Sequence, residues 1–289
     1  MIIVITGPTG VGKTKLSVEL AKRINAEIIN GDSMQVYKGL DIATAKVKEN
    51  EKEGVIHHLF DIVDPTYTYT VYNYQKDCRK AIEEIASRGK NIIIVGGTGL
   101  YIKAALYNYN FNDESTTYDF SNKTNLELFE EITKHNKDID IHVNNRKRLE
   151  RELTKIYNNT TSLGKGNEVL YPFTIIGLTT DRDNLYERIN NRVDVMIQDG
   201  LIEEARSLFD RGINSKAINT GIGYKELYKY FNNEISLEEA LDLIRKNSRH
   251  YAKRQYTFFN NQFNMNWFNV NYEDFNKTID EVYNFIDKE

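Results

Sequence analysis

The sequence has little cysteine, no surplus of positive charge and no long apolar run. Cys78 is the one cysteine among 289 residues, which excludes an intramolecular disulfide, and no Cys/His spacing resembles a zinc site. Lys and Arg total 38 against 42 Asp and Glu, a formal net charge of −4, so the chain is not a dedicated polycation. No apolar stretch approaches the ~18 residues that span a bilayer, and the first residues lack the basic region of a signal peptide. We therefore expect a cytoplasmic protein with no membrane segment.

Apolar runs alternate with helical periodicity in the first hundred residues, and 40% of the chain is apolar. The predicted strands are 2–6, 27–30 and 91–95, and the predicted helices are 13–24 and 71–88. This alternation predicts an α/β fold, a parallel sheet with helices on both faces. Ligands bind beyond the carboxyl ends of such strands, so the residues after Thr6, Asn30 and Val95 are site candidates.

The stretch 112–172 is polar, with helical periodicity only near 126–132 and 149–156. A structureless loop of that length would be unusual, so we predict a helical insertion domain at 112–172 within a core made of 1–111 and 173–289. A fourth strand is predicted at 173–178. From Asp181 onward the chain is expected to be helical almost to its end, with helices at 185–198, 201–211, 237–258 and 275–286.

A glycine-rich motif joins the first predicted strand to the first helix. GPTGVGKT matches G-x-x-x-x-G-K-[ST], whose glycines turn backbone N–H groups around phosphate oxygens. Lys13 would add a positive charge, Thr14 a hydroxyl for Mg²⁺, and the helix its positive dipole end. The motif predicts phosphate binding and does not specify the reaction. Its residues are Gly7, Pro8, Thr9, Gly10, Val11, Gly12, Lys13 and Thr14.

The acidic residue near the phosphate loop follows a different strand from the one that it follows in phosphate-loop ATPases. The strand 91–95 ends in Gly96-Gly97-Thr98, where a phosphate-loop ATPase or GTPase usually has the carboxylate that helps to hold Mg²⁺, so ATP hydrolysis is disfavoured. Asp32 instead follows the second strand. It could serve as a general base or as a helix amino-terminal cap, and position alone leaves both readings open.

Six segments in order carry a family resemblance: GPTGVGKT (7–14), NGDSMQVYKGLDIATAK (30–46), HHLFDIVDP (57–65), VGGTGLYIKA (95–104), GIGYKE (221–226) and AKRQYTF (252–258). The set resembles the bacterial tRNA dimethylallyltransferases, the IPP transferase family. The resemblance implies a P-loop NTPase-like core. It also implies transfer of the dimethylallyl group from dimethylallyl diphosphate to N6 of the adenosine 3′ of the anticodon (position 37), in tRNAs that read UNN codons. The phosphate loop would then hold a prenyl diphosphate rather than ATP.

The resemblance also implies roles for single residues. Asp32 would be the general base and Thr98 would lie near the reacting centre. The phosphate loop with Arg188 and Arg192 would bind diphosphate, with Mg²⁺ as the metal and Thr14 as its ligand. The family match and the basic clusters described next give the expected tRNA-binding residues, which are Asp32, Ser33, Met34, Gln35, Thr98, Lys147, Arg148, Arg151, Gly221, Gly223, Tyr224, Lys225, Arg249, Lys253, Arg254 and Gln255.

Two basic clusters favour a nucleic-acid surface. Between Leu243 and Tyr272 there is no acidic residue, and the stretch contains Arg245, Lys246, Arg249, Lys253 and Arg254. The second cluster, in the predicted insertion, consists of Arg146, Lys147, Arg148, Arg151 and Lys155. Cations can position RNA through its phosphates, although either cluster alone also fits an ordinary solvated helix face. We expect a tRNA anticodon stem-loop as the partner of a monomeric protein.

Three other functions remain as alternatives. An adenylate dimethylallyltransferase would use free AMP or ATP as acceptor, and the insertion and the basic helix argue against it. A small-metabolite kinase would need ATP as donor, and the missing acidic strand end argues against it. A non-catalytic phosphate-loop RNA-binding protein would have no need of Asp32, Lys13 and Thr14.

Overall fold

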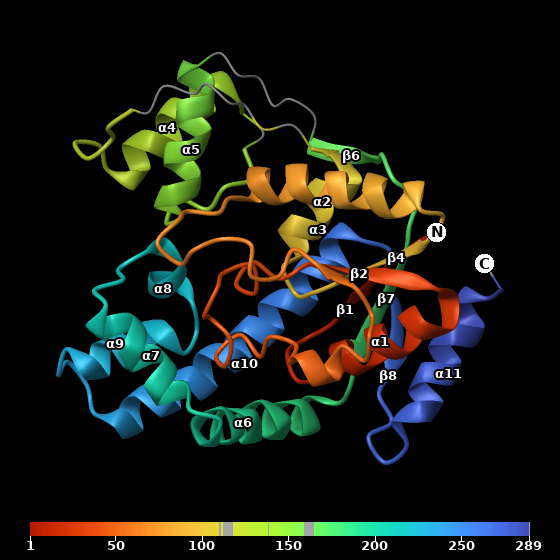
Figure 1. Ribbon diagram of the computed structural model, residues 1–289. Coiled ribbons are helices and arrows are strands. Elements are labelled where there is room, and N and C mark those ends of the chain that lie inside the picture. The colour runs from red at the N-terminus through yellow and green to blue at the C-terminus, as the bar shows by residue number, and fades with distance from the viewer. Residues whose placement is uncertain (110, 112–117, 138, 159–164, 289) are drawn as a thin grey trace. The chain divides into compact units, whose positions relative to one another are not determined.

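The structure is a computed structural model that describes residues 1–109, 111, 118–137, 139–158 and 165–288 (Figure 1). The chain forms two compact units, one of Met1–Leu106 with Leu170–Glu289 and one of Tyr107–Val169. The smaller unit thus runs from 107 to 169 and not from the predicted 112 to 172. The difference arises from two short strands, β5 (Tyr107–Tyr109) and β6 (Lys165–Val169), which pair antiparallel within it and which no periodicity indicated.

Six parallel strands form the sheet of the larger unit in the order β3-β2-β4-β1-β7-β8. The strands are β1 (Ile2–Thr6), β2 (Ala26–Asn30), β3 (His57–His58), β4 (Asn91–Val95), β7 (Thr174–Thr179) and β8 (Asn266–Asn269). Every residue of β1 and β2 is buried, because helices cover both faces of the sheet. In Figure 1, α2 (Val71–Ser87) and α3 (Gly99–Leu106) lie above the strands, and α1 (Lys13–Ile24) and α11 (Phe275–Ile286) lie below them. The predicted α/β fold is confirmed.

The four predicted strands are present within one residue of their predicted bounds, as β1, β2, β4 and β7. The expectation of an almost wholly helical chain after Asp181 was wrong at β8. This strand has only four residues, none of them fully buried. It forms because it pairs with β7, with Asn266 of β8 opposite Ile176 of β7. A short edge strand of this kind depends on its neighbour and leaves little trace in local periodicity.

The larger unit contains further helices after β7. These helices are α6 (Arg182–Gln198), α7 (Leu201–Asp210), α8 (Lys216–Thr220), α9 (Tyr224–Phe231) and α10 (Leu237–Gln262), and a short 3₁₀ helix spans Glu49–Glu51. The long helix α10 packs against α3, α6 and α9. Ser236 and Glu239 form a capping box that starts it. None of the helices in the described part of the chain is long and apolar enough to cross a membrane.

The smaller unit contains two packed helices, α4 (Asn125–His135) and α5 (Arg146–Tyr157). Their apolar faces meet around Leu128, Ile132, Leu149 and Leu153, which are all fully buried. Lys147, Arg148 and Arg151 lie on the side of α5 away from these leucines and are exposed. The insertion is therefore a small helical unit with its own core and a two-stranded sheet.

The order of the strands brings the candidate residues to one edge of the sheet. β4 lies between β1 and β2, so the segment after Val95 stands between the phosphate loop and the segment after Asn30. The N–H of Gly31 donates to the carbonyl of Val95 at 2.7 Å, and the N–H of Gly96 donates to that of Ile5 at 3.1 Å. A Cβ on Gly96 would lie only 2.1 Å from the Gly31 carbonyl carbon, so this close approach of two backbones requires glycine.

Candidate active site

The phosphate loop Gly7–Thr14 wraps around the ammonium group of its own lysine. Gly7, Gly10 and Gly12 have positive φ angles of 140°, 86° and 95°, which glycine adopts without strain. Lys13 Nζ donates to the carbonyl oxygens of Gly7 at 3.0 Å and of Pro8 at 2.8 Å. Of the remaining loop residues, Val11 is fully buried and belongs to the core. The loop thus holds a cation at the amino terminus of α1, where a phosphate group would bind.

Two arginines of α6, for which the family resemblance implied a role in diphosphate binding, reach the loop. The guanidinium of Arg192 donates to the hydroxyl of Thr9, and Arg188 Nε donates to the carbonyl oxygen of Gly10 at 3.2 Å. The Arg188 guanidinium also lies 3.8 Å from the centre of the Tyr272 ring. Both arginines therefore have their charges fixed beside the phosphate loop.

Burial and crowding of positive charge lower the pKa values in this cluster. Burial, and then the charge of Arg192, lower the pKa of Lys13 to about 8, against the opposing effect of Asp32. Burial likewise lowers the pKa of Arg192 to about 10. Two cations that are poorly hydrated and close together provide a strong site for a polyanion.

Asp32 lies directly after β2 in a tight turn. Asn30 fixes its backbone, because Asn30 Oδ1 accepts from the Asp32 N–H at 2.8 Å and Asn30 Nδ2 donates to the Asp32 carbonyl at 3.0 Å. Asp32 Oδ1 accepts from the Met34 N–H at 2.8 Å. No helix begins in this segment, so the helix-cap reading is wrong and Asp32 caps only a turn. Burial raises the pKa of Asp32, opposed by the Met34 N–H and by the charge of Lys13.

Thr98 and Ser33 join the ends of β4 and β2. The Thr98 hydroxyl accepts from the Ser33 N–H at 3.0 Å and donates to the Ser33 hydroxyl at 3.2 Å. Gln255 of α10 donates from Nε2 to the Gly97 carbonyl at 3.1 Å. A helix far along the chain is therefore attached directly to the carboxyl edge of the sheet.

Tyr251 is a residue of this site that the sequence analysis did not include. It lies on α10 four residues before Gln255, so the two side chains share one face of the helix. Burial and the charge of Asp32 raise the pKa of its hydroxyl, while hydrogen bonds to Thr98 and Gln255 oppose the rise. Its position one helical turn before a predicted contact residue was the signal that could have identified it.

These elements surround one pocket of about 790 Å³ in the larger unit. Its walls are formed by the phosphate loop, by residues 32–35 and 41–48, by Gly96 and Gly97, by Arg188 and Arg192, by residues 220–223 with Lys225, and by Tyr251, Arg254 and Gln255 of α10. Asp32 and Lys13 both line it. The pocket therefore combines the cations at the phosphate loop with a half-buried carboxylate.

The GIGYKE motif contributes to the pocket mainly through its backbone. The side chain of Tyr224 is fully buried and its hydroxyl donates to Glu204 Oε1 at 2.6 Å, so this side chain packs inside the protein and the tRNA contact expected of Tyr224 stays a prediction. A Cβ on Gly221 would lie 2.8 Å from Met34 Cε, and a Cβ on Gly223 would lie 2.9 Å from the Cβ of Ala43. The two glycines thus let this segment pack closely against the loops that follow β2, and of the predicted residues here only Lys225 presents a charged side chain to the pocket.

The basic residues of α10 differ in their surroundings. Lys253 and Arg254 are exposed, and Arg254 also lines the pocket. Arg249 is half-buried and donates to Asn190 Oδ1 on α6 at 2.6 Å. Arg249 is therefore partly engaged within the protein, whereas Lys246, Lys253 and Arg254 are the exposed cations of this cluster.

In the smaller unit, Lys147, Arg148 and Arg151 are exposed on α5. Arg146, in contrast, donates to the carbonyl oxygens of Phe120 and Lys123 and has a structural role there. The predicted cluster of five cations thus presents at least three of them to solvent.

The donor set at the phosphate loop fits a Mg²⁺ ion that is shared with a bound phosphate group. Thr14 is half-buried and lines the pocket. Within the described residues there is no group of three or more His, Cys, Asp and Glu side chains that could hold a metal by themselves. Mg²⁺ is commonly held by one or two protein ligands with substrate phosphates and water, which is the arrangement that Thr14 allows.

Comparisons with known proteins agree with this geometry. The family model described as IPP transferase matches residues 35–262. The chain is 46% identical over 302 residues to a tRNA dimethylallyltransferase of Geobacillus thermodenitrificans, covering 99% of this chain and 96% of the relative. It is 45% identical over 284 residues to that of Bacillus subtilis, covering 93% and 90%.

Solved structures show the same relationship. The crystal structure of the tRNA isopentenylpyrophosphate transferase of Bacillus halodurans has a TM-score of 0.79 and 43% identity, covering 99% of this chain and 95% of that one. A eukaryotic dimethylallyltransferase acting on tRNA has a TM-score of 0.76 and 28% identity, covering 92% and 73%. The family model covers most of the chain and the relatives cover 93–99% of it, so the protein belongs to the IPP transferase family.

Proposed function

We propose that this protein transfers the dimethylallyl group of dimethylallyl diphosphate to the exocyclic N6 of the adenosine 3′ of the anticodon, position 37, in tRNAs that read UNN codons. The products are N6-dimethylallyladenosine in tRNA and diphosphate. The main support is that Lys13 and Asp32 line the same pocket. Lys13 supplies a positive charge for the diphosphate of the donor, and Asp32 supplies a carboxylate for the amine of the acceptor. The names of the relatives agree with this reaction class.

The phosphate loop would bind the diphosphate of the donor. Lys13, Arg188 and Arg192 supply three positive charges, and the loop N–H groups and the amino terminus of α1 supply further donors. As the C1–O bond of the allylic diphosphate breaks, negative charge develops on the leaving oxygen. Cations that are already fixed in place stabilise this charge without reorganisation. Mg²⁺ held by Thr14 and the diphosphate would add a further positive charge when it is bound.

Asp32 would bind the acceptor. Its carboxylate accepts a hydrogen bond from the adenine N6 amine, and it takes the N6 proton as the N6–C1 bond forms. The elevated pKa of Asp32 suits this role, because a more basic carboxylate accepts a proton more readily. The turn bond from Met34 and the fixed backbone at Asn30 hold the carboxylate in position.

The acceptor is proposed to be tRNA because cations lie on more than one part of the chain. Lys253 and Arg254 are exposed on α10, and Lys147, Arg148 and Arg151 are exposed on α5. A free nucleotide would need no such surfaces, whereas an RNA stem-loop has phosphates over a wide area. This is the observation that separates tRNA from free AMP or ATP as the acceptor.

The test is a set of separate reactions of the purified protein. Labelled dimethylallyl diphosphate is supplied with unmodified tRNA in one and with AMP in another, and a third contains ATP with small metabolites. Label in tRNA at the adenosine 3′ of the anticodon is the expected result. Label in AMP alone would identify an adenylate-specific enzyme. Transfer of phosphate from ATP to a metabolite, without prenyl transfer, would identify a kinase and overturn the proposal.

A further inference from the structure

One turn forms part of the pocket wall next to Gln35. Residues 41–46 all line the pocket, and the turn is closed by the Lys46 N–H, which donates to the Asp41 carbonyl at 2.9 Å. Gln35 Nε2 donates to the Thr44 carbonyl at 2.9 Å and to the Ala45 carbonyl at 3.3 Å. Both amide hydrogens of Gln35 are thereby directed to this turn, so the orientation of Gln35 depends on where the turn lies.

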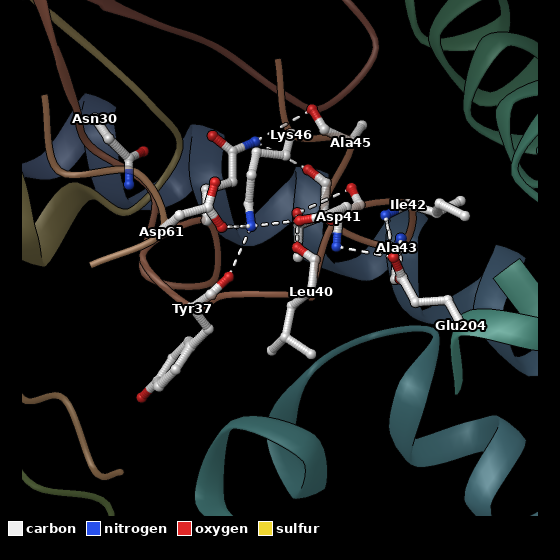
Figure 2. Close-up of polar contacts among 12 residues, drawn as sticks. Asn30, Tyr37, Leu40, Asp41, Ile42, Ala43, Ala45, Lys46, Asp61 and Glu204 are labelled. Atoms are coloured by element: carbon white, nitrogen blue, oxygen red, sulfur yellow. Dashed lines mark hydrogen bonds and ion pairs between the residues drawn. The ribbon is translucent and has the colours of Figure 1, made fainter. Parts of the chain in front are cut away.

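Glu204 of α7 holds one end of the turn with a single carboxylate (Figure 2). Its oxygens accept from the backbone N–H of Asp41 at 3.0 Å, of Ile42 at 2.9 Å and of Ala43 at 3.4 Å. The Tyr224 hydroxyl is a fourth donor at 2.6 Å. A carboxylate has about four acceptor sites, so these four donors use its whole capacity.

Lys46 holds the other end (Figure 2). Its side chain is only 5% exposed, and Nζ lies 2.5 Å from Asp41 Oδ1, 2.5 Å from Asp61 Oδ1 and 2.7 Å from the carbonyl oxygen of Tyr37. An ammonium group has three hydrogens, and each has a partner here. The cation therefore joins the turn to two other segments of the chain.

Within the described residues, no hydrogen bond joins this turn to the phosphate loop. Glu204 instead connects the turn to α9 through Tyr224, and Gly223 of the same motif packs against Ala43. The bonds of the turn thus link it to the elements beside Gln35. They do not include the phosphate loop, where the donor diphosphate would bind.

We propose that Glu204 and Lys46 are positioning residues for the acceptor substrate. They hold the turn 41–46, and the turn orients Gln35 and shapes the adjoining pocket wall. This inference rests on the proposed function, since it concerns the half of the pocket that would receive the tRNA nucleotide. It predicts that damage to the turn affects use of tRNA and spares binding of dimethylallyl diphosphate.

The main test is Glu204→Gln. The carboxamide keeps the shape of the side chain but offers one acceptor oxygen and an NH₂ group that would face backbone N–H donors. We expect kcat/KM for tRNA to fall about 10- to 100-fold, as for a displacement of about 1 Å in an active site, with an unchanged KM for dimethylallyl diphosphate. Tyr224→Phe removes one of the four donors and should cause a smaller loss, about threefold to tenfold. Glu203→Gln, at an exposed neighbouring position of α7, is the matched control and should behave as wild type.

Lys46→Met provides a second test on the other end of the turn. It keeps the apolar stem and removes the charge, and the same selective loss with tRNA is expected. Lys46→Arg, which keeps the charge, should restore part of the activity. Thermal unfolding of each variant shows whether it is folded. If Glu204→Gln and Lys46→Met do not fold, the kinetics of Tyr224→Phe, the mildest change, test the proposal.

The outcomes separate the two proposals. Wild-type protein that does not prenylate tRNA would overturn the proposed function. If wild type prenylates tRNA and Glu204→Gln and Lys46→Met do so with unchanged kinetics, the positioning role is wrong. An equal rise in KM for both substrates, or a loss of activity that follows only the loss of thermal stability, would also overturn it.

Discussion

Arg192 and Thr9 are 183 positions apart in the chain, and the guanidinium of Arg192 donates a hydrogen bond to the Thr9 hydroxyl. The bond attaches α6 to the phosphate loop. It also brings the charge of Arg192 near Lys13, which contributes to the lowered pKa of that lysine, about 8. Binding of a diphosphate would relieve the repulsion between these two cations, so their closeness favours the donor substrate.

The pKa of Lys13 predicts the alkaline limit of activity. Lys13 acts as a cation only below its pKa, so kcat/KM for dimethylallyl diphosphate should fall as the pH rises through about 8. Arg192→Met removes a charge that lowers this pKa, so the alkaline limb should move to higher pH while KM for the diphosphate rises. A pH profile of kcat/KM measures both effects.

The control for this prediction is Arg182→Met on the same helix. Arg182 is exposed and lies over the ring of Tyr186, 5.1 Å from its centre. Its replacement should leave the alkaline limb in place. If the alkaline limb of the kcat/KM profile stays at the same pH in Arg192→Met, the proposed coupling between Arg192 and Lys13 is wrong.

Asp32→Asn should lower the rate of prenyl transfer about 10²- to 10⁴-fold, the usual contribution of a general base. Binding of tRNA should change little, because asparagine keeps the shape of the side chain and can still form hydrogen bonds. In wild type, Asp32 must be ionised to act, and burial raises its pKa. The acid limb of kcat/KM should therefore lie above the ordinary aspartate pKa of about 3.9, and activity should decline as the pH falls through it.

Asp64→Asn is the matched control for the carboxylate, since Asp64 is exposed and bonds only locally to Thr66. It should retain wild-type turnover. Wild-type turnover in Asp32→Asn as well would make Asp32 a turn-capping residue without a catalytic role.

Reversing the charges of Lys253 and Arg254 to Glu should weaken tRNA binding. Each phosphate contact that is lost should reduce the slope of log Kd against log salt by about 0.7 to 0.9, because fewer counterions are released. Affinity for dimethylallyl diphosphate should not change. Titrations across a salt series test this, with Lys277→Glu, at an exposed position of α11 outside the pocket lining, as the control. Parallel salt dependences for wild type and the double variant would exclude these two residues from the RNA surface.

Reversal of Lys147, Arg148 and Arg151 to Glu tests the insertion. All three are exposed on the side of α5 away from Leu149 and Leu153, so the change should leave the thermal unfolding of the protein nearly unaltered. The dissociation constant for tRNA should rise and its salt dependence should become shallower. Unchanged binding would mean that this face is only a solvated helix surface.

Much of this protein follows from local sequence. The β-branched run at 2–6, the glycines after it and the periodicity of α1 determine a phosphate loop, since only glycine takes the positive φ angles at Gly7 and Gly12 without strain. The alternation of strands and helices determines a parallel sheet, and the sheet places Asp32 and Thr98 at its carboxyl edge with that loop. These features depend on residues that are close together in the chain, so the sequence pattern predicts them.

Tertiary structure decided the features that depend on distant partners. β8 forms because β7 offers it a neighbour, and Tyr251 enters the site because α10 packs against α3 and α6 and its Gln255 bonds to Gly97 just after β4. Tyr224 is buried, and its hydroxyl donates to the Glu204 carboxylate. Arg249 carries the same charge as the exposed Lys253 and Arg254 near it, but its bond to an amide on α6 changes its surroundings. Each outcome depends on contacts between segments that are far apart in sequence. Local periodicity does not report the energies of such contacts. Only the folded chain therefore shows which motif residues face the pocket and which hold its walls.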